Sequence, residues 1–380
     1  MQHQTLVLTA VALTLNAAPR SSWAADGAPE STGVSVSAYA AASYYHSTGY
    51  PGGPAAAGSG AAGFDVHQFD LQHDPSQIDE AGVTLAYQPK QGLGALVDVI
   101  AGEDASILRQ AEGGDDSSLD VRQAFAQYAD GPVTVMLGKL LPCAGAEVIN
   151  PTQDLNYSRS LLFTLSEPLT LTGARATYAP NDALTFNAGI NSGWNVTTSG
   201  HGLRSGEAGA SWSPSKTFSL SLQSNFGELL PGGPQRTLID LVLSDTLAAD
   251  LTLLMSADWD QQSATGAAAG GTWYGVAGTV GYAFKARWRA AVRAEYLEDA
   301  DGFLTGTPHG QHLAETTVTI GFRPTRSLEL RAEWRADFAE FPVFLHQPAL
   351  DLYPYGTSPM RLTTQLGQFA LQAVYTFYGS

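Results

Sequence analysis

Two segments in the C-terminal third of the sequence carry arginine and carboxylate side chains at alternate positions, with Ala291 as the one interruption. Together they contain Arg287, Arg289, Arg293, Glu295, Glu329, Arg331, Glu333, Arg335 and Asp337. Residues two apart point to the same face of a β-strand, so each segment would present one mixed-charge face. Such a face can orient water and polar solutes along a pore. It can equally hold a wall together as ion pairs worth ~0–1 kcal/mol each, and the two interpretations are compatible.

Motifs for enzymatic catalysis are absent from the sequence. There is no Gly-x-Ser-x-Gly elbow, no phosphate-binding loop and no paired-cysteine pattern, and Cys143 is the single cysteine. His309 and His312 are three residues apart, but two histidines without a third ligand do not indicate a metal site. We therefore expect no catalytic residues, no metal and no cofactor. A barrel hydrolase is kept as an alternative.

The opposite faces of the charged segments are apolar. Leu330, Trp334 and Phe338, for example, alternate with the charges of the second segment. The same period of two recurs along the chain and predicts sixteen strands. They lie near residues 33–45, 78–88, 93–102, 119–129, 132–140, 168–179, 183–193, 204–213, 217–226, 236–246, 250–260, 271–284, 287–297, 313–323, 327–338 and 367–378.

The connections between these strands alternate strictly between short and long. Residues 130–131 and 285–286 are typical short connections, whereas residues 46–77, 141–167 and 339–366 are long. A transmembrane barrel has short turns at one end and long loops at the other, while a propeller or a sandwich has no reason for two classes. Because no apolar run is long enough for a membrane helix, a closed barrel is the remaining way to span a membrane. We predict an all-β, antiparallel up-and-down transmembrane barrel.

The N-terminus indicates export. Residues 6–18 are apolar, and Ser22-Trp23-Ala24 resembles a small-x-small cleavage site. We predict a signal peptide over residues 1–24 and a single barrel domain over residues 25–380. A basic segment before the apolar stretch is missing, and a start Met assigned at the wrong position would explain this.

The third long connection, residues 141–167, is a candidate constriction. A barrel of about sixteen strands encloses water, so inward-facing charges would need no buried partner. This loop combines Glu147, Tyr157 and Arg159 with an apolar run at residues 161–163, which should avoid solvent. We predict that the loop folds into the lumen and narrows it. The loop at residues 339–366 is the rival plug.

The charge balance is strongly acidic. Thirty-six Asp and Glu residues against 19 Lys and Arg give a formal net charge of −17. Such a field raises the local cation concentration and disfavours nucleic acid, so we expect a modest cation preference.

The segment from Gly138 to Asn195 carries a family resemblance. It contains Gly138-Lys139, residues 145–151 (GAEVINP), residues 156–160 (NYSRS), Glu167-Pro168, Gly173 and residues 191–195 (NSGWN). This pattern resembles the OmpL-like β-barrel porin family of Gram-negative outer membranes. The resemblance implies a porin barrel without a known cofactor or an established substrate.

These observations favour a porin of the cell outer membrane. We expect passive diffusion of small hydrophilic solutes or ions through the lumen, with outer-membrane lipid as a partner and a trimer or monomer as the assembly. A structural or adhesive barrel that acts through its long extracellular loops is the main alternative.

Overall fold

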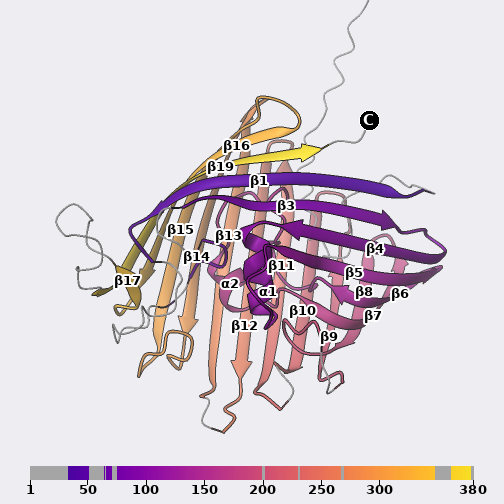
Figure 1. Ribbon diagram of the computed structural model, residues 1–380, viewed down its shortest axis with the longest axis horizontal. Helices are drawn as coiled ribbons and strands as arrows, with labels where there is room; N and C mark the ends of the chain where they lie inside the picture. The colour runs from indigo at the N-terminus through magenta and orange to yellow at the C-terminus, as the bar shows by residue number, and fades with distance from the viewer. Residues whose placement is uncertain are drawn as a thin grey trace, which may run out of the picture.

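The chain folds into a closed barrel. The computed structural model describes residues 33–50, 64, 66–70, 75–198, 202–229, 232–266, 269–346 and 361–377. In this part of the chain, sixteen antiparallel strands close in the order β1-β19-β16-β15-β14-β13-β12-β11-β10-β9-β8-β7-β6-β5-β4-β3 (Figure 1). The predicted sixteen-stranded barrel is confirmed. The predicted signal peptide, residues 1–24, lies outside the described residues.

The strand bounds agree with the predicted ranges to within a few residues. The first half of the wall comprises β1 (Ser35–Ser47), β3 (Ser76–Tyr87), β4 (Gly92–Ala101), β5 (Leu119–Asp130), β6 (Val133–Leu140), β7 (Leu171–Asn181), β8 (Leu184–Asn191) and β9 (Ser205–Trp212). The second half comprises β10 (Phe218–Glu228), β11 (Gln235–Ala248), β12 (Leu251–Gln262), β13 (Gly271–Lys285), β14 (Trp288–Asp299), β15 (Gln311–Phe322), β16 (Leu328–Ala339) and β19 (Gln365–Phe377).

Alternation sorts the side chains of each strand between the two faces of the wall. On β16, Leu330 and Trp334 are exposed on the outside, whereas Arg331 and Arg335 are buried inside. Closure pairs the last strand with the first, from Ala38↔Phe377 to Ser47↔Gln368. A closed barrel leaves no strand edge facing lipid, which is the condition for crossing a membrane with β-structure.

The register places both ends of the barrel domain beside the short turns. The start of β1 pairs with the end of β19 on one side and with the end of β3 on the other, where the turn to β4 follows. The turn between β5 and β6 is equally short, and its Gly131 has a φ of 56°. The long loops therefore all leave from the opposite end.

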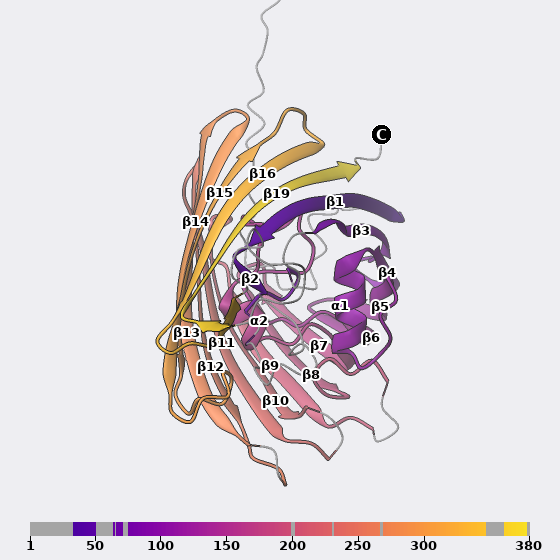
Figure 2. The ribbon, with the colours of Figure 1, turned by 60° about the vertical axis from the view of Figure 1, so that its left-hand side comes forward.

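The long loops contain structure of their own. Helix α1 (Glu103–Ala111) follows β4, and α2 (Leu161–Leu165) lies in the third long loop. Strands β2 (Gly49–Tyr50), β17 (Phe344–His346) and β18 (Arg361–Thr363) form a small separate sheet that joins the first and last long loops. Figure 2 shows α1 and α2 surrounded by the strands of the barrel. Among the described residues, no helix has the length and apolar character to cross a membrane.

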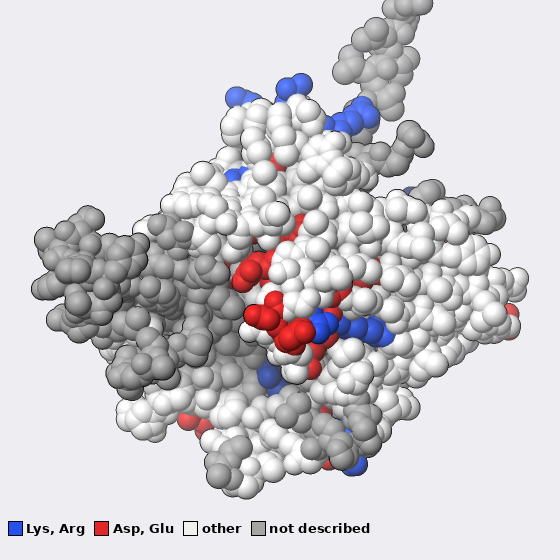
Figure 3. Space-filling model, in the orientation of Figure 1, with Lys and Arg blue, Asp and Glu red and all other residues white. Residues whose placement is uncertain are grey.

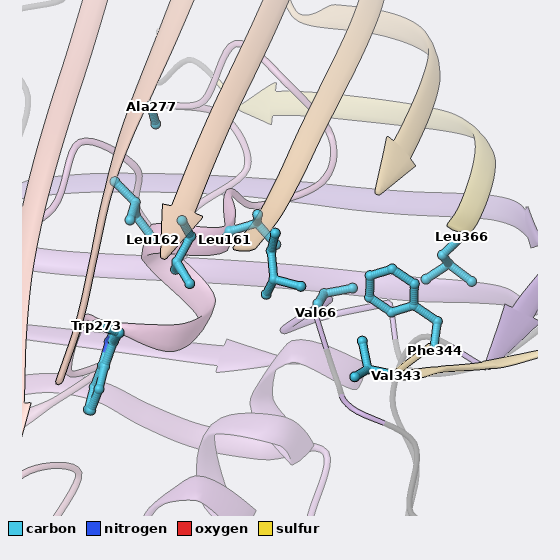
Figure 4. Packing of buried hydrophobic residues seen from close by; sticks show 10 residues of the cluster. Val66, Leu161, Leu162, Trp273, Ala277, Val343, Phe344 and Leu366 are labelled. Atoms are coloured by element: carbon cyan, nitrogen blue, oxygen red, sulfur yellow. The ribbon is translucent and has the colours of Figure 1, made fainter. Parts of the chain in front are cut away.

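An apolar cluster fastens three long loops together inside the barrel. Val66 of the first loop, Leu161 and Leu162 of α2, and Val343 and Phe344 of the last loop are all buried in it. Trp273 of β13 and Leu366 of β19 belong to the same cluster, as Figure 4 shows. The first, third and last loops thus form one packed unit against the wall.

Candidate functional site

The inner faces of β14, β15 and β16 form a continuous charged surface. Arg289, Arg293 and Glu295 come from β14, and Glu329, Arg331, Glu333, Arg335 and Asp337 come from β16. All eight side chains are buried, and none is more than 6% exposed. On both strands these side chains alternate with apolar residues and therefore share the inner face of the wall.

Loop 141–167 lies against this surface. It leaves the wall at β6 and returns at β7, whereas β14–β16 lie across the barrel: six strands separate β7 from β14, and five separate β6 from β16. The loop therefore crosses the lumen. Residues 168–170, expected in the strand, belong to the loop because β7 begins at Leu171.

Four wall arginines hold the main chain of the loop. Each guanidinium donates a hydrogen bond to a carbonyl oxygen of the segment between residues 155 and 159. The pairs are Arg289 with Leu155 (2.6 Å), Arg331 with Asn156 (3.3 Å), Arg293 with Ser158 (2.8 Å) and Arg335 with Arg159. These contacts do not depend on the side chains of the loop, because every residue offers the same carbonyl.

Two wall carboxylates accept hydrogen bonds from the same stretch of main chain. Glu333 accepts from the N–H groups of Tyr157 (2.6 Å) and Ser158 (2.9 Å). Glu295 accepts from the first two N–H groups of α2, those of Leu161 (2.9 Å) and Leu162 (3.3 Å). The first turn of a helix has N–H groups without partners, and a carboxylate satisfies them well.

The structure differs here from the expectation that inward charges need no buried partner. The arginines and carboxylates of β14 and β16 are buried and bonded because the loop covers them. Arg287 is the exception among the candidate residues. It is exposed in the turn between β13 and β14 and does not join the charged surface.

The three candidate residues of the loop do different things. Glu147 pairs with Arg293 of the wall at 2.6 Å and accepts the Ser160 N–H at 2.6 Å. The guanidinium of Arg159 points back toward its own loop and donates hydrogen bonds to the carbonyls of Val148 and Ile149. Tyr157 donates its hydroxyl to Asp70 of the first loop at 2.6 Å. Glu147 therefore attaches the loop to the wall, and Arg159 and Tyr157 fix its shape.

The electrostatics of the loop reflect its burial. Burial favours the neutral form of Glu147, but Arg293, the Ser160 N–H and Arg159 outweigh it and hold the pKa of Glu147 below its usual range. Burial raises the pKa of Asp154 to about 6, against the attraction of Arg159. Burial, with Asp240 nearby, raises the pKa of Glu167 well above its usual value. Glu147 is therefore the carboxylate of the loop that stays ionised most readily.

Sequence reasoning missed the residue that holds the C-terminal end of the loop. Arg236 of β11 donates to the carbonyls of Leu165 (2.7 Å) and Ser166 (3.1 Å). Its guanidinium lies 4.5 Å and 4.6 Å from the ring centroids of Trp194 and Trp273. Arginine stacks well on aromatic faces, so the two rings fix its position. Nothing in the sequence pattern brings these three residues together, because they lie on separate segments.

Helix α1 was also missed. It packs on the inner faces of β3, β4 and β5. Just beyond its end, Glu112 pairs with Lys139 of β6 at 2.5 Å, and Lys139 also pairs with Asp120 of β5 at 3.0 Å. Figure 3 shows acidic side chains gathered over this helix, with basic side chains directly beside them. The acidic first turn, Glu103 and Asp104, was the signal that could have identified it.

His67 of the first long loop is buried beside the charged surface. It is 1% exposed, and its Nε2 lies 2.9 Å from Asp337 of β16. The first long loop therefore also contacts the charged surface. Within the described residues, no group of three or more His, Cys, Asp or Glu residues could hold a metal ion.

Comparison with known proteins identifies this architecture. The family model described as "Putative beta-barrel porin-2, OmpL-like" matches residues 33–374. No curated protein matches the chain.

Several solved structures have the same fold. The outer membrane channel DcaP of Acinetobacter baumannii is 11% identical with a TM-score of 0.58, over 90% of this chain and 97% of that one. An anion-selective porin from Comamonas acidovorans is 11% identical with a TM-score of 0.58, over 91% and 100%. The trimer form of OmpT from Vibrio cholerae is 10% identical with a TM-score of 0.57, over 90% and 99%. At these identities the likeness shows the fold alone.

Proposed function

The chain belongs to the OmpL-like family of β-barrel porins, and we propose that loop 141–167 forms the constriction of its channel. Membership makes the protein an outer-membrane channel through which solutes diffuse passively. The finer question is what narrows the lumen, and the contacts between the loop and the far wall support the loop as the answer.

One observation carries this proposal. Main-chain groups between Leu155 and Leu162 bond to side chains of β14 and β16, across the barrel from the strands that bear the loop. A loop attached at both sides of a lumen must reduce its open area. Buried, charge-assisted hydrogen bonds to ionised groups are worth about 1.5–3 kcal/mol each, so several together make this position the stable one.

The permeating molecules would be small and hydrophilic. The inner face of β10 carries the polar Ser219, Ser221, Gln223 and Asn225, and that of β11 carries Asp240 and Ser244 beside the apolar Leu238 and Val242. Hydroxyl and amide groups can replace the water around a polar solute, whereas an apolar solute gains nothing there. The absence of a Gly-x-Ser-x-Gly elbow and of other hydrolase motifs from the sequence favours the channel over a barrel hydrolase.

Single-channel conductance tests the constriction. Deletion of residues 145–163 removes both the attached segment and most of α2, so we expect a larger conductance in planar bilayers. The heat-modifiable band of a folded barrel in gel electrophoresis controls for folding. An unchanged conductance from a correctly folded deletion variant would show that the constriction lies elsewhere.

The last long loop, residues 339–366, is the alternative candidate for the constriction. Only residues 339–346 and 361–366 of it lie in the described part, and there Val343 and Phe344 pack beside α2. Deletion of residues 347–360 leaves those contacts in place. We expect a smaller change in conductance from it than from the deletion of residues 145–163.

A further inference from the structure

The barrel wall is low on one side. Strands β6, β8 and β9 have eight residues each, whereas β11–β16 have between 12 and 15. At a rise of ~3.3 Å per residue and a tilt of about 40°, eight residues climb ~20 Å. The apolar band of such barrels is ~25 Å tall, and a membrane-spanning strand has about 9–11 residues.

The aromatic girdle is incomplete on the same side. On β10–β16, β19 and β1, exposed aromatic residues stand near the loop ends of most strands. They are Tyr44, Phe226, Trp259, Tyr274, Tyr296, Trp334, Phe338 and Phe369. On β3–β9, which are described in full, every exposed aromatic residue stands near a short turn. They are Tyr87, Tyr128, Tyr178, Phe186 and Trp212.

These two observations are independent, and both point to contact with protein rather than lipid. Aromatic rings mark the level where a wall meets the membrane–water interface. A lipid-facing wall that is short and has no ring at that level would force the bilayer to thin beside it. A second copy that presents the same low wall matches its height. The aromatic residues near the loop ends of β10–β16, β19 and β1 would then lie on the outer, lipid-facing surface of the assembly.

We propose that the outer face of β6–β9 is the surface through which this porin associates with a second copy of itself. The charged side chains of these strands, Lys139, Arg175 and Glu207, are buried inside the barrel. Along β7, β8 and β9 the outer face therefore presents no charge that a partner would have to bury.

The shape of the face fits close approach. Ala176, Ala188 and Ala208 are directly opposite one another across β7, β8 and β9, and all three are exposed. In membranes, small side chains let two backbones pack closely, because van der Waals contact replaces the hydrophobic effect between them.

A recess at the top of the low wall offers room for side chains of the partner. The pairing of β5 with β6 begins at Ala124↔Lys139, so β5 extends above β6. A cavity of about 630 Å³ lies there, and its lining combines the apolar Val99, Leu119 and Val121 with the charged Arg109, Glu112, Asp120 and Lys139.

Tryptophan substitutions test the surface. We expect Ala188→Trp and Ala176→Trp to convert the oligomer to monomers in native mass spectrometry from mild detergent. Ala294→Trp, on the exposed face of β14, is the matched control and should leave the oligomer intact. A monomeric wild type, an Ala188→Trp variant that stays oligomeric, or an equal loss in the control would overturn the proposal.

A cross-linking measurement keeps the proposal testable if the tryptophan variants fold poorly. In a Cys143→Ser background, a bismaleimide should link Ala188→Cys between copies in the membrane, and Ala294→Cys should stay unlinked; the reverse pattern would overturn the proposal. The conductance of one barrel should be the same in Ala176→Trp, Ala188→Trp and Ala294→Trp as in wild type, and the same in the two cysteine variants as in their Cys143→Ser parent, because these substitutions lie on the outer face. A variant that has lost association between copies is thereby distinguished from one whose channel no longer conducts normally.

Discussion

At the scale of single residues, Glu333 shows how the wall holds the loop. Its carboxylate accepts the N–H groups of Tyr157 and Ser158 and the hydroxyl of Thr319 (2.6 Å). A glutamine has one acceptor oxygen in place of two, and its amide nitrogen would face a loop N–H. Leaving a buried donor without a partner costs about 1–3 kcal/mol.

We expect Glu333→Gln to loosen the loop without unfolding the barrel. Hydrogen exchange at the amides of residues 157 and 158 should accelerate about tenfold or more, since 1.4 kcal/mol corresponds to a factor of ten. Glu340→Gln is the control, because Glu340 is exposed and pairs only with His312 among the described ion pairs. Equal exchange in wild type and Glu333→Gln would contradict this account of the attachment.

Asp154 makes the loop sensitive to pH. Burial raises its pKa to about 6 in the folded protein, whereas an unfolded Asp titrates near ~3.9. The folded state therefore binds the proton of Asp154 more tightly than the unfolded state does. The resulting contribution to the free energy of unfolding is fully present below pH ~4 and is lost as the pH rises through 6. The loss amounts to at most about 3 kcal/mol.

Comparison with Asp154→Asn isolates that contribution. The asparagine variant has no proton to lose, so its stability relative to wild type should improve between pH 4 and pH 7. Urea unfolding of the detergent-folded barrel at the two pH values measures the difference. A difference that is independent of pH, or that has the opposite sign, would rule out Asp154 as the titrating group.

The side of the barrel wall on which each side chain lies could be predicted from the sequence, but its hydrogen-bond partners could not. Alternation placed Arg293, Glu333 and Arg335 correctly on the inner face, because the period of a strand fixes it. Their partners are carbonyl and N–H groups of a loop, which are the same for every residue type. A sequence therefore holds no signal for these contacts, and only the path of the loop reveals them.

At the scale of elements, β6 depends on one glycine. Gly138 has a φ of 146°, and a Cβ placed there would lie 2.1 Å from the carbonyl oxygen of Ala124 and 2.7 Å from Cα of Phe125. Both neighbours are backbone atoms of the paired strand β5 and cannot move aside cheaply. Gly278 of β13 has no atom within 4 Å of the same position.

Alanine at these two positions should have opposite outcomes. We expect Gly138→Ala to destabilise the barrel by more than ~2 kcal/mol, through strain and a displaced strand pair. Gly278→Ala should be close to neutral. The urea midpoint of the heat-modifiable band compares the two, and equal midpoints would refute the role given to Gly138.

The strands were predictable as elements and the helices were not. Strands of a barrel repeat one pattern many times, so weak signals reinforce each other from segment to segment. Helix α1 occurs once, and its buried Ile107 and Leu108 pack with Ile100 of β4 and with Phe69, Ile149 and Phe163 of the long loops. Tertiary contact therefore decides its existence, as for most short helices.

At the scale of the whole molecule, charge is divided unequally around the lumen. The wall arginines each have a carboxylate beside them, such as Glu329 for Arg289 and Asp337 for Arg335. On β11 and β12, by contrast, Asp240 lies directly opposite Asp258, and neither carboxylate belongs to an ion pair among the described residues. The positive groups are thus neutralised locally, while part of the negative charge is not.

This asymmetry, with the formal net charge of −17, predicts a channel that prefers cations. A surplus of negative potential raises the local concentration of cations and lowers that of anions. In a KCl gradient across a planar bilayer, the reversal potential should therefore indicate K⁺ over Cl⁻. Asp240→Asn combined with Asp258→Asn should reduce the preference, whereas Glu340→Gln on the exposed end of the barrel should change it less. Raising the salt should weaken the preference in all of them, because the screening length falls from ~10 Å at 0.1 M to ~3 Å at 1 M. A wild-type channel selective for Cl⁻ would show that the wall arginines, although paired, dominate the potential along the path of the ions.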